Sequence, residues 1–133
     1  MTMTVPGDPA PQEGALFGVD TQLAGRFARL TVRGELDLAT VGIFEAAVCA
    51  VRSRAIDRIE IDLSDLTFIG SAGVAALLAV NSCARDAGCT LTLVRGPQPV
   101  HRIFELTGID DQFAFRSPSP SPSAARGTLR IVS

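Results

Sequence analysis

The residue with the clearest indication of a chemical role is Ser71, in the segment Ile69-Gly-Ser-Ala-Gly. This segment resembles half of the Gly-x-Ser-x-Gly turn of serine hydrolases, but Ile69 stands where that motif has its first glycine. A hydrolase also needs a base, and Asp86 and His101 are the only pair in a workable chain order. The sequence offers no clear oxyanion loop, so a small serine hydrolase is the remote alternative.

Two other interpretations of Ser71 follow from its predicted place at the start of a helix. Serine is a preferred N-cap residue, because its hydroxyl accepts a hydrogen bond from an amide of the first turn. The same position also suits a phosphate, because a helix start presents free amides and the positive end of the helix dipole. Gly70 and Gly73 flank the serine with little bulk, so a kinase or a partner would have access to it.

Signatures of cofactor and metal sites are missing. The chain contains no lysine, which excludes a Gly-x-x-x-x-Gly-Lys phosphate loop, and no Gly-x-Gly-x-x-Gly follows a strand pattern. Cys49, Cys83 and Cys89 form no Cys-x-x-Cys pair, and the lone His101 is predicted to be structural or exposed. We therefore expect no cofactor and no metal, with reduced thiols and with Cys49 and Cys83 as small core residues.

Composition indicates one folded domain. Of 133 residues, 47% are hydrophobic and 20% are charged, which is enough apolar material for a core. The formal net charge of −2 argues against a partner that is a nucleic acid. The longest apolar stretch, residues 73–80, is far short of the roughly 20 residues that cross a bilayer, and the N-terminus lacks the features of a secretory signal. We expect a cytoplasmic protein without membrane insertion, monomeric when free.

The elements that must position Ser71 alternate between strand and helix patterns. Strand patterns cover residues 27–33, 58–63 and 90–94, with shorter candidates at 16–19 and 111–115. Helical spacing covers residues 41–51, 71–88 and 99–108, and Asp37 or Thr40 can cap the first of these helices. This order predicts an α/β fold whose mixed, mostly parallel β-sheet carries helices mainly on one face, with the early strands antiparallel at an edge.

The two ends of the chain are predicted to lie outside this domain. Residues 1–14 have no hydrophobic period, and residues 116–133 begin with a Ser-Pro repeat that favours extended, hydrated backbone. The last segment, residues 129–132, has a strand-like pattern, but a frayed end is the expectation. The predicted domain therefore spans residues 15–115.

Three blocks of sequence resemble a known family. They are Gly34-Glu-Leu-Asp-Leu-Ala-Thr, Ile61-Asp-Leu-Ser-Asp-Leu-Thr-Phe-Ile-Gly-Ser-Ala-Gly and Phe104-Glu-Leu-Thr-Gly-Ile. They resemble the STAS domain and are more closely similar to bacterial anti-sigma factor antagonists, over nearly all of residues 16–115. The resemblance implies a domain without enzymatic activity that captures an anti-sigma factor, often also a serine protein kinase, and so frees the sigma factor. It also implies that phosphorylation of a serine blocks capture and that a phosphatase restores it.

Carried over by position, the resemblance makes Ser71 the phosphorylation site. It implies a partner-binding set made of Asp37, Asp62, Gly70, Ser71, Ala72 and Gly73. Gly70 replaces the family's usual aspartate and so removes a charge beside the acceptor serine. Ala72 replaces the family's second hydroxyl residue and so leaves Ser71 as the one candidate acceptor in the motif. If the first two blocks lie on neighbouring strands, Asp37 lies near Ser71. Asp37 as a helix cap and Asp62 as a polar strand residue are the simpler interpretations.

The alternative within the family is a STAS subunit of another system, such as a lipid-transport complex or a stressosome, without phosphorylation gating. Stressosome proteins usually carry a second sensor domain, for which 133 residues leave no room. The lipid-transport subunit is a short free-standing domain and stays open as an alternative.

Overall fold

The computed structural model describes residues 17–118, and the predictions for residues 1–14 and for most of the tail lie outside this range. In chain order the elements are β1 (Gly18–Ala24), β2 (Phe27–Leu36), α1 (Val41–Arg52), β3 (Arg58–Ile69), α2 (Ser71–Asp86), β4 (Thr90–Val94), α3 (Gln98–Leu106), the short 3-10 helix η1 (Asp110–Gln112) and β5 (Phe115–Arg116). None of the helices in this part of the chain combines the length and the apolar character needed to cross a membrane.

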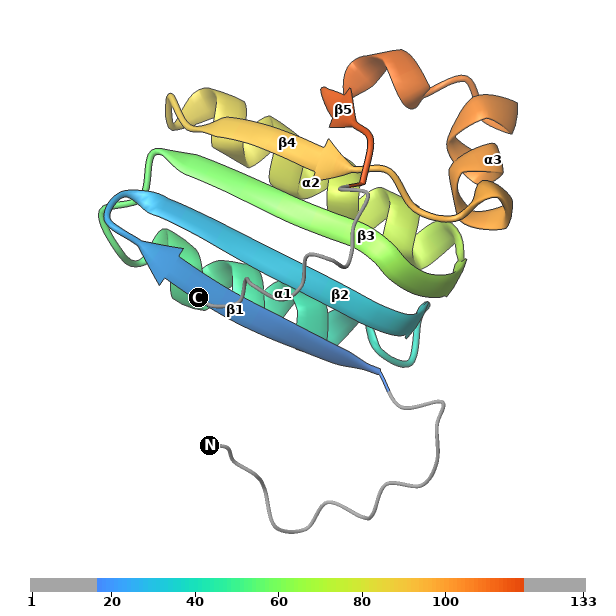
Figure 1. Ribbon diagram of the computed structural model, residues 1–133, viewed down its shortest axis with the longest axis horizontal. Coiled ribbons are helices and arrows are strands. Elements are labelled where there is room, and N and C mark those ends of the chain that lie inside the picture. Colours follow the sequence, from blue (N-terminus) through green and yellow to red (C-terminus); the bar gives the residue numbers. More distant parts are fainter. Residues whose placement is uncertain (1–16, 119–133) are drawn as a thin grey trace, which may run out of the picture.

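The sheet has the strand order β1-β2-β3-β4-β5, with β1 antiparallel to β2 and every other pair parallel. Helices α1 and α2 lie together on one face, and α3 lies beyond the ends of β3 and β4 (Figure 1). The predicted fold class is therefore confirmed, including the antiparallel edge. Because the strand ends of β2 and β3 point the same way, the segments that follow them meet at one end of the molecule.

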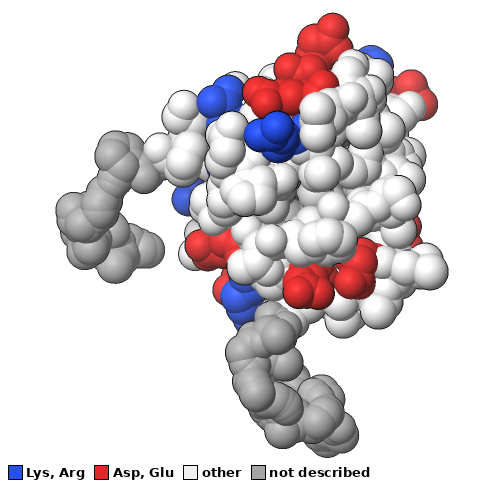
Figure 2. Space-filling view, turned by 90° about the vertical axis from the view of Figure 1, so that its right-hand side faces the viewer, with Lys and Arg blue, Asp and Glu red and all other residues white. Residues whose placement is uncertain are grey.

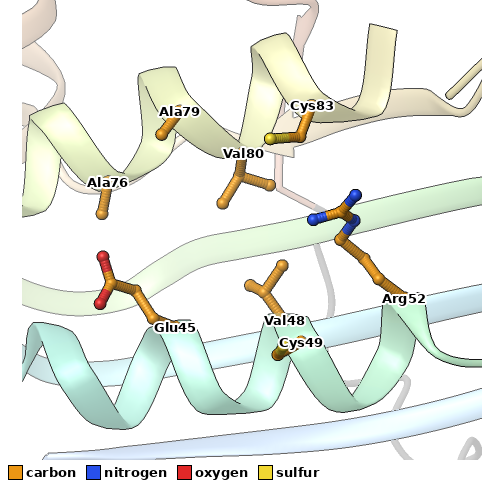
Figure 3. Close-up of a pocket in the computed structure, with 8 residues that line it drawn as sticks. All are labelled: Glu45, Val48, Cys49, Arg52, Ala76, Ala79, Val80 and Cys83. Carbon is orange, nitrogen blue, oxygen red and sulfur yellow. The ribbon is translucent and has the colours of Figure 1, made fainter. Parts of the chain in front are cut away.

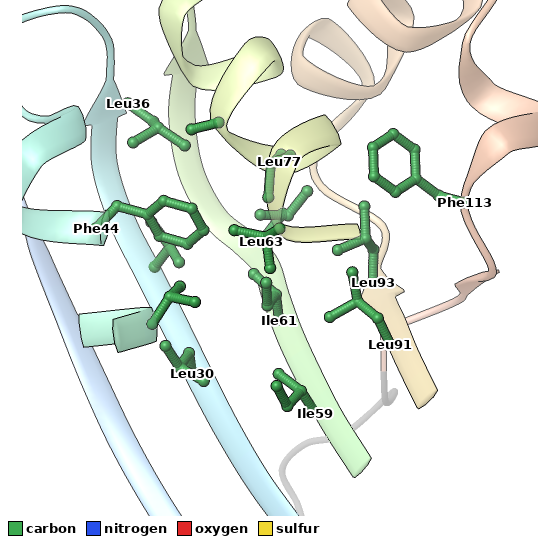
Figure 4. Packing of buried hydrophobic residues seen from close by; sticks show 14 of the residues in the cluster. Leu30, Leu36, Phe44, Ile59, Ile61, Leu63, Leu77, Leu91, Leu93 and Phe113 are labelled. Carbon is green, nitrogen blue, oxygen red and sulfur yellow. The ribbon is translucent and has the colours of Figure 1, made fainter. Parts of the chain in front are cut away.

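The core fills the space between the sheet and the two helices (Figure 4). Alternate strand residues point toward the helices, and each of them contributes on the order of 1.5–3 kcal/mol by burial. The fully buried side chains of this layer include Leu30, Ile61, Leu63 and Leu93 from the strands and Phe44 and Leu77 from the helices. Leu77, rather than its neighbour Leu78, is the leucine of α2 that is fully buried.

Strand β3 carries two extra residues relative to β2. Thr31 and Arg33 of β2 pair with Asp62 and Asp65, and the next shift lies between the pairs Gly34–Leu66 and Glu35–Phe68. Each shift is a β-bulge, which re-aims the side chains that follow it. Ile69 thereby enters the core while Phe68 stays 48% exposed at the end of the sheet.

The face of the sheet opposite the helices carries charged pairs. The buried carboxylate of Glu60 accepts two hydrogen bonds from Arg116, each 3.0 Å long, and lies 2.8 Å from the guanidinium of Arg29. The hydrogen bonding to Glu60 raises the pKa of Arg116. Arg116, which sequence reasoning assigned to the tail, is therefore part of the sheet through β5.

The helix ends agree with the sequence pattern, but two cysteines that were predicted to lie in the core do not. Gly88 and Gly108 close the predicted helical ranges 71–88 and 99–108, and their φ of +73° and +75° is the left-handed conformation common just after a helix. In contrast, Cys49 and Cys83 are exposed and not core residues. Cys49 follows the buried Val48, and Cys83 precedes the buried Ala84. Because one step along a helix rotates the side-chain direction by about 100°, both cysteines point away from the core.

Candidate functional site

A hollow of about 620 Å³ lies where the ends of β2 and β3 meet the start of α2. It is lined by Asp37, Leu38, Phe68, Gly70, Ser71, Ala72 and Ala75. The amide of Gly70 donates a hydrogen bond of 2.9 Å to the carbonyl of Leu36, which ties the start of α2 to the end of β2. The first two sequence blocks of the predicted site therefore form one surface.

Ser71 is the first residue inside α2 and is exposed. The N-cap residue is Gly70, and no side-chain hydrogen bond caps this helix, so the prediction that Ser71 is the N-cap is wrong. A residue at the first helical position has its side chain beside the free amides of the helix start. The hydroxyl is thus free of a capping role, at the end of the helix that favours negative charge.

Asp37 lines the same hollow as Ser71, as expected for the ends of neighbouring parallel strands. Its carboxylate accepts a hydrogen bond of 3.0 Å from the amide of Ala39, and its own amide donates one of 3.0 Å to the hydroxyl oxygen of Thr40. Thr40 is the N-cap residue of α1, but its hydroxyl points back to the carbonyl of Glu35 at 2.7 Å and makes no capping bond. Neither candidate cap therefore caps α1, and Asp37 shapes the turn that forms one wall of the hollow.

Two residues of the predicted set do not line the hollow. Asp62 lies on the opposite face of the sheet, where its carboxylate accepts hydrogen bonds from the amide and the hydroxyl of Ser64 at 2.9 and 2.6 Å. Gly73 is buried, and a Cβ there would lie 2.8 Å from Leu36 Cγ and 2.9 Å from Ile69 Cγ1. Gly73 thus lets α2 pack closely on the ends of β2 and β3, whereas sequence reasoning gave it a place on the contact surface.

Sequence reasoning missed the two large apolar side chains of the hollow. Leu38 is 81% exposed and Phe68 is 48% exposed, although leucine and phenylalanine usually lie in the core. The signal for Leu38 was a leucine between the last strand residue and the predicted helix, where no core period requires it. Phe68 was hidden by the bulges of β3, because the alternation of the strand could not be extended through them.

The surface around the hollow is largely uncharged. Figure 2 shows this end of the molecule, with acidic side chains above and below a broad area without charged atoms. Apolar surface with a polar rim is the usual composition of a protein-binding patch. The arrangement therefore suits contact with another protein better than the binding of a small polar substrate.

The residues that a serine hydrolase would need are not brought together. Ser71 and Asp86 are the two ends of α2, which places them about 22 Å apart along the helix axis. His101 is buried against the rings of Phe104 and Phe115, and its Nε2 lies 3.7 Å from the carboxylate of Glu105. Within residues 17–118, no group of three or more His, Cys, Asp or Glu side chains is placed to hold a metal ion.

Comparison with known proteins gives one family and several similar structures. A family model described as Mlab, STAS domain matches residues 19–116 of this chain. An anti-sigma factor antagonist from Mycobacterium paratuberculosis is 24% identical with a TM-score of 0.71, over 83% of this chain and 92% of that one. SpoIIAA from Bacillus in its unphosphorylated form is 19% identical with a TM-score of 0.65, over 75% and 89% of the two chains. An anti-sigma factor antagonist STAS domain from Rhodobacter sphaeroides is 29% identical with a TM-score of 0.52, over 68% and 92%.

Proposed function

This chain belongs to the STAS domain family, and on that premise we propose that it is an anti-sigma factor antagonist acting in the cytoplasm. Its unphosphorylated form captures an anti-sigma factor, a class of protein that is often also a serine kinase, and so releases the sigma factor. It acts by binding rather than by catalysis. The family match confirms the STAS resemblance of the three sequence blocks, and what we propose beyond it is the anti-sigma factor as the partner.

The observation that carries the proposal is the position of Ser71 in an exposed apolar hollow. Leu38 and Phe68 offer large apolar side chains to a partner, and Ala72 and Ala75 leave room for one. Large apolar groups in the centre of an interface supply most of its binding energy. Contact therefore centres on Ser71, and we place Asp37, Gly70 and Ala72 in the same interface.

Phosphorylation of Ser71 prevents this contact by charge. A phosphate adds about −1.5 to −2 charges at neutral pH, next to Asp37 and inside a surface that must be desolvated on binding. The helix start tolerates the phosphate in the free domain because of its amides and dipole. SpoIIAA from Bacillus, which shares the fold, is known in unphosphorylated and phosphorylated forms, and by analogy a kinase and a phosphatase switch this chain.

The test is incubation with the candidate anti-sigma kinase and ATP, followed by mass spectrometry and a pull-down with the anti-sigma factor. Ser71→Ala is expected to bind and to accept no phosphate, and Ser71→Glu is expected to lose about 1–3 kcal/mol of binding free energy. Ser82→Glu is the matched control, because it adds the same charge to an exposed position of α2 away from the hollow. Phosphate on another residue, or equal binding by the alanine and glutamate variants, would remove Ser71 as the switch.

A second candidate function is a STAS subunit of another system, such as a lipid-transport complex, that binds its partner without gating. Gly70 and Ala72 favour this alternative, because they remove the carboxylate and the second hydroxyl of the usual phosphorylation motif. The same experiment separates the two. Stable capture of an anti-sigma factor supports the first, and the absence of both capture and phosphate supports the second.

A further inference from the structure

A second hollow, independent of the Ser71 surface, lies between α1 and α2 (Figure 3). Its volume is about 160 Å³, and it is open to solvent. Val48, Ala76, Ala79 and Val80 form its apolar floor, and the remaining lining residues are Glu45, Cys49, Arg52 and Cys83. A space of this size holds about five waters or the body of a small organic molecule.

Two of the chain's three cysteines lie in this groove, on opposite walls. Cys49 belongs to α1 and Cys83 to α2, and both are exposed. Free cysteine is among the most buried residue types, so two exposed thiols that face one small space are unusual. A molecule in the groove therefore has a thiol on either side of it.

Arg52 supplies a positive charge beside these thiols. Its side chain extends from α1 toward α2, on the side of Cys83 (Figure 3). Arg52 takes part in none of the ion pairs found among residues 17–118, and the carboxylate of Glu45 lies at the other end of the groove (Figure 3). A guanidinium that lines the groove attracts an anionic reagent toward the two thiols.

We propose that this groove is a thiol-modification site that takes a small anionic disulfide. The thiolate of Cys49 or Cys83, whose proton passes to solvent, attacks one sulfur of the disulfide. A new S–S bond forms to the protein, the S–S bond of the reagent breaks, and half of the reagent leaves as a thiolate. If the thiolate of the second groove cysteine then attacks the Sγ atom of the first, the mixed S–S bond breaks, the other half of the reagent leaves as a thiolate, and a Cys49–Cys83 bridge remains. Either course consumes one disulfide molecule per chain.

The third cysteine serves as an internal reference. Cys89 is half-buried and lies outside the groove, in a smaller hollow that also touches Arg52. Burial raises the pKa of the Cys89 thiol, Asp57 raises it further, and Arg52 lowers it by a smaller amount. Its reaction is therefore expected to be slower than that of the groove thiols.

The test uses dithiobis(nitrobenzoate), an anionic disulfide, on the full chain, with absorbance for the released thiolate and peptide mass spectrometry for the position. We expect one reagent molecule consumed per chain in the fast phase, in the wild type and in both Cys49→Ser and Cys83→Ser. The double variant is expected to lose the fast phase. Two molecules consumed in the wild type, or a first adduct on Cys89, would overturn the shared site.

The role of Arg52 is measured against a neutral disulfide, dithiodipyridine. In Arg52→Gln the ratio of the anionic to the neutral rate is expected to fall about fivefold, the effect of one unit charge about 4 Å away in water. Arg85→Gln, which removes an arginine of α2 outside the groove, is expected to leave this ratio unchanged. An unchanged ratio in Arg52→Gln, or an equal fall in Arg85→Gln, would overturn the proposed steering.

Discussion

At the scale of single residues, the first turn of α2 combines close packing with exposure. Ser71 faces solvent at the hollow, whereas Gly73, two residues later, is buried against Leu36 and Ile69. Gly70, with φ of −100° and ψ of −179°, has an extended conformation that any residue adopts. The two glycines that flank the serine therefore have different reasons to be small, and their substitutions have different consequences.

Gly73→Ala is expected to destabilise the fold although alanine is the better helix former. Its Cβ would lie 2.8 Å from both the Cγ and the carbonyl oxygen of Leu36, so strand or helix must shift. Overpacking of this kind costs about 1–3 kcal/mol in the free energy of unfolding, measured with urea. Gly42→Ala in α1 is the control, because nothing lies within 4 Å of its Cβ. It is expected to stabilise by about 0.4–1 kcal/mol, and equal signs for the two variants would contradict this account.

Gly70→Asp is expected to increase phosphorylation of Ser71 by the kinase that binds the wild type. The added Cβ would lie 3.4 Å from Phe68 Cε2 and 3.7 Å from Asp37 Cβ, which the site accommodates. The variant restores the carboxylate that the family usually has beside its acceptor serine. Gly70→Asn has nearly the same shape and the same capping ability without the charge. The initial rate of phosphate incorporation, followed by intact mass, should rise in the aspartate variant alone, and equal rates would exclude the charge as the cause.

At the scale of elements, the sequence pattern predicted the buried faces of those helices and strands whose hydrophobic residues recur at a regular period. The core face of α1 followed from steps of three and four, and the first half of β3 followed from strict alternation through Leu63. In α2 only Leu77 of the predicted core residues is buried. Beyond Leu63 the buried residues are Leu66 and Ile69, three apart, because each bulge inserts one residue. No local period indicates a bulge, since it depends on the pairing with β2. The end of β3 and the exposure of Phe68 could not be predicted for that reason.

The candidate site was likewise predictable only in part. Ser71 and Asp37 could be placed together because parallel strands end at the same side of a sheet. Along a helix, each residue rotates the direction of the side chain by about 100°. Where a helix contains many small residues, the sequence pattern does not determine at which residue the helix begins or which side chain faces the core. Ser71 was therefore predicted one position too early in its helix, and Cys49 and Cys83 were predicted inside the core instead of on its edge.

The packing of α2 on the sheet is tested with a pair of adjacent leucines. Leu77 is fully buried, whereas Leu78, one position further along the helix, is only half-buried against the core. Leu77→Ala is expected to cost about 2–5 kcal/mol through lost burial and a cavity, and Leu78→Ala is expected to cost clearly less. Urea unfolding of both variants measures the difference. A larger cost at Leu78 would mean that the helix is rotated relative to this description.

At the scale of the whole molecule, the short strand β5 forms one edge of the sheet and is held there by the contacts of a few residues. The amide of Arg95 donates a hydrogen bond of 2.8 Å to the carbonyl of Arg116, and the ring of Phe115 lies 4.8 Å from that of His101. The guanidinium of Arg116 satisfies the buried carboxylate of Glu60. Aromatic pairs and charged hydrogen bonds of this kind together contribute about 2 kcal/mol or more. The stability of the domain therefore depends on where the chain is cut after β5.

Two shortened chains test this dependence, one of residues 15–118 and one of residues 15–114. The first keeps β5, and the removed ends are expected to lie outside the domain, so its melting temperature should stay within about 2 °C of the full chain. The second loses Phe115 and Arg116 and leaves Glu60 with Arg29 alone, so its melting temperature should fall by roughly 8–16 °C. Calorimetry of the three chains measures both effects, and capture of the anti-sigma factor by the 15–118 chain shows whether the hollow at Ser71 suffices for binding. A fall of several degrees in the 15–118 chain would show that residues 1–14 or 119–133 pack on the domain.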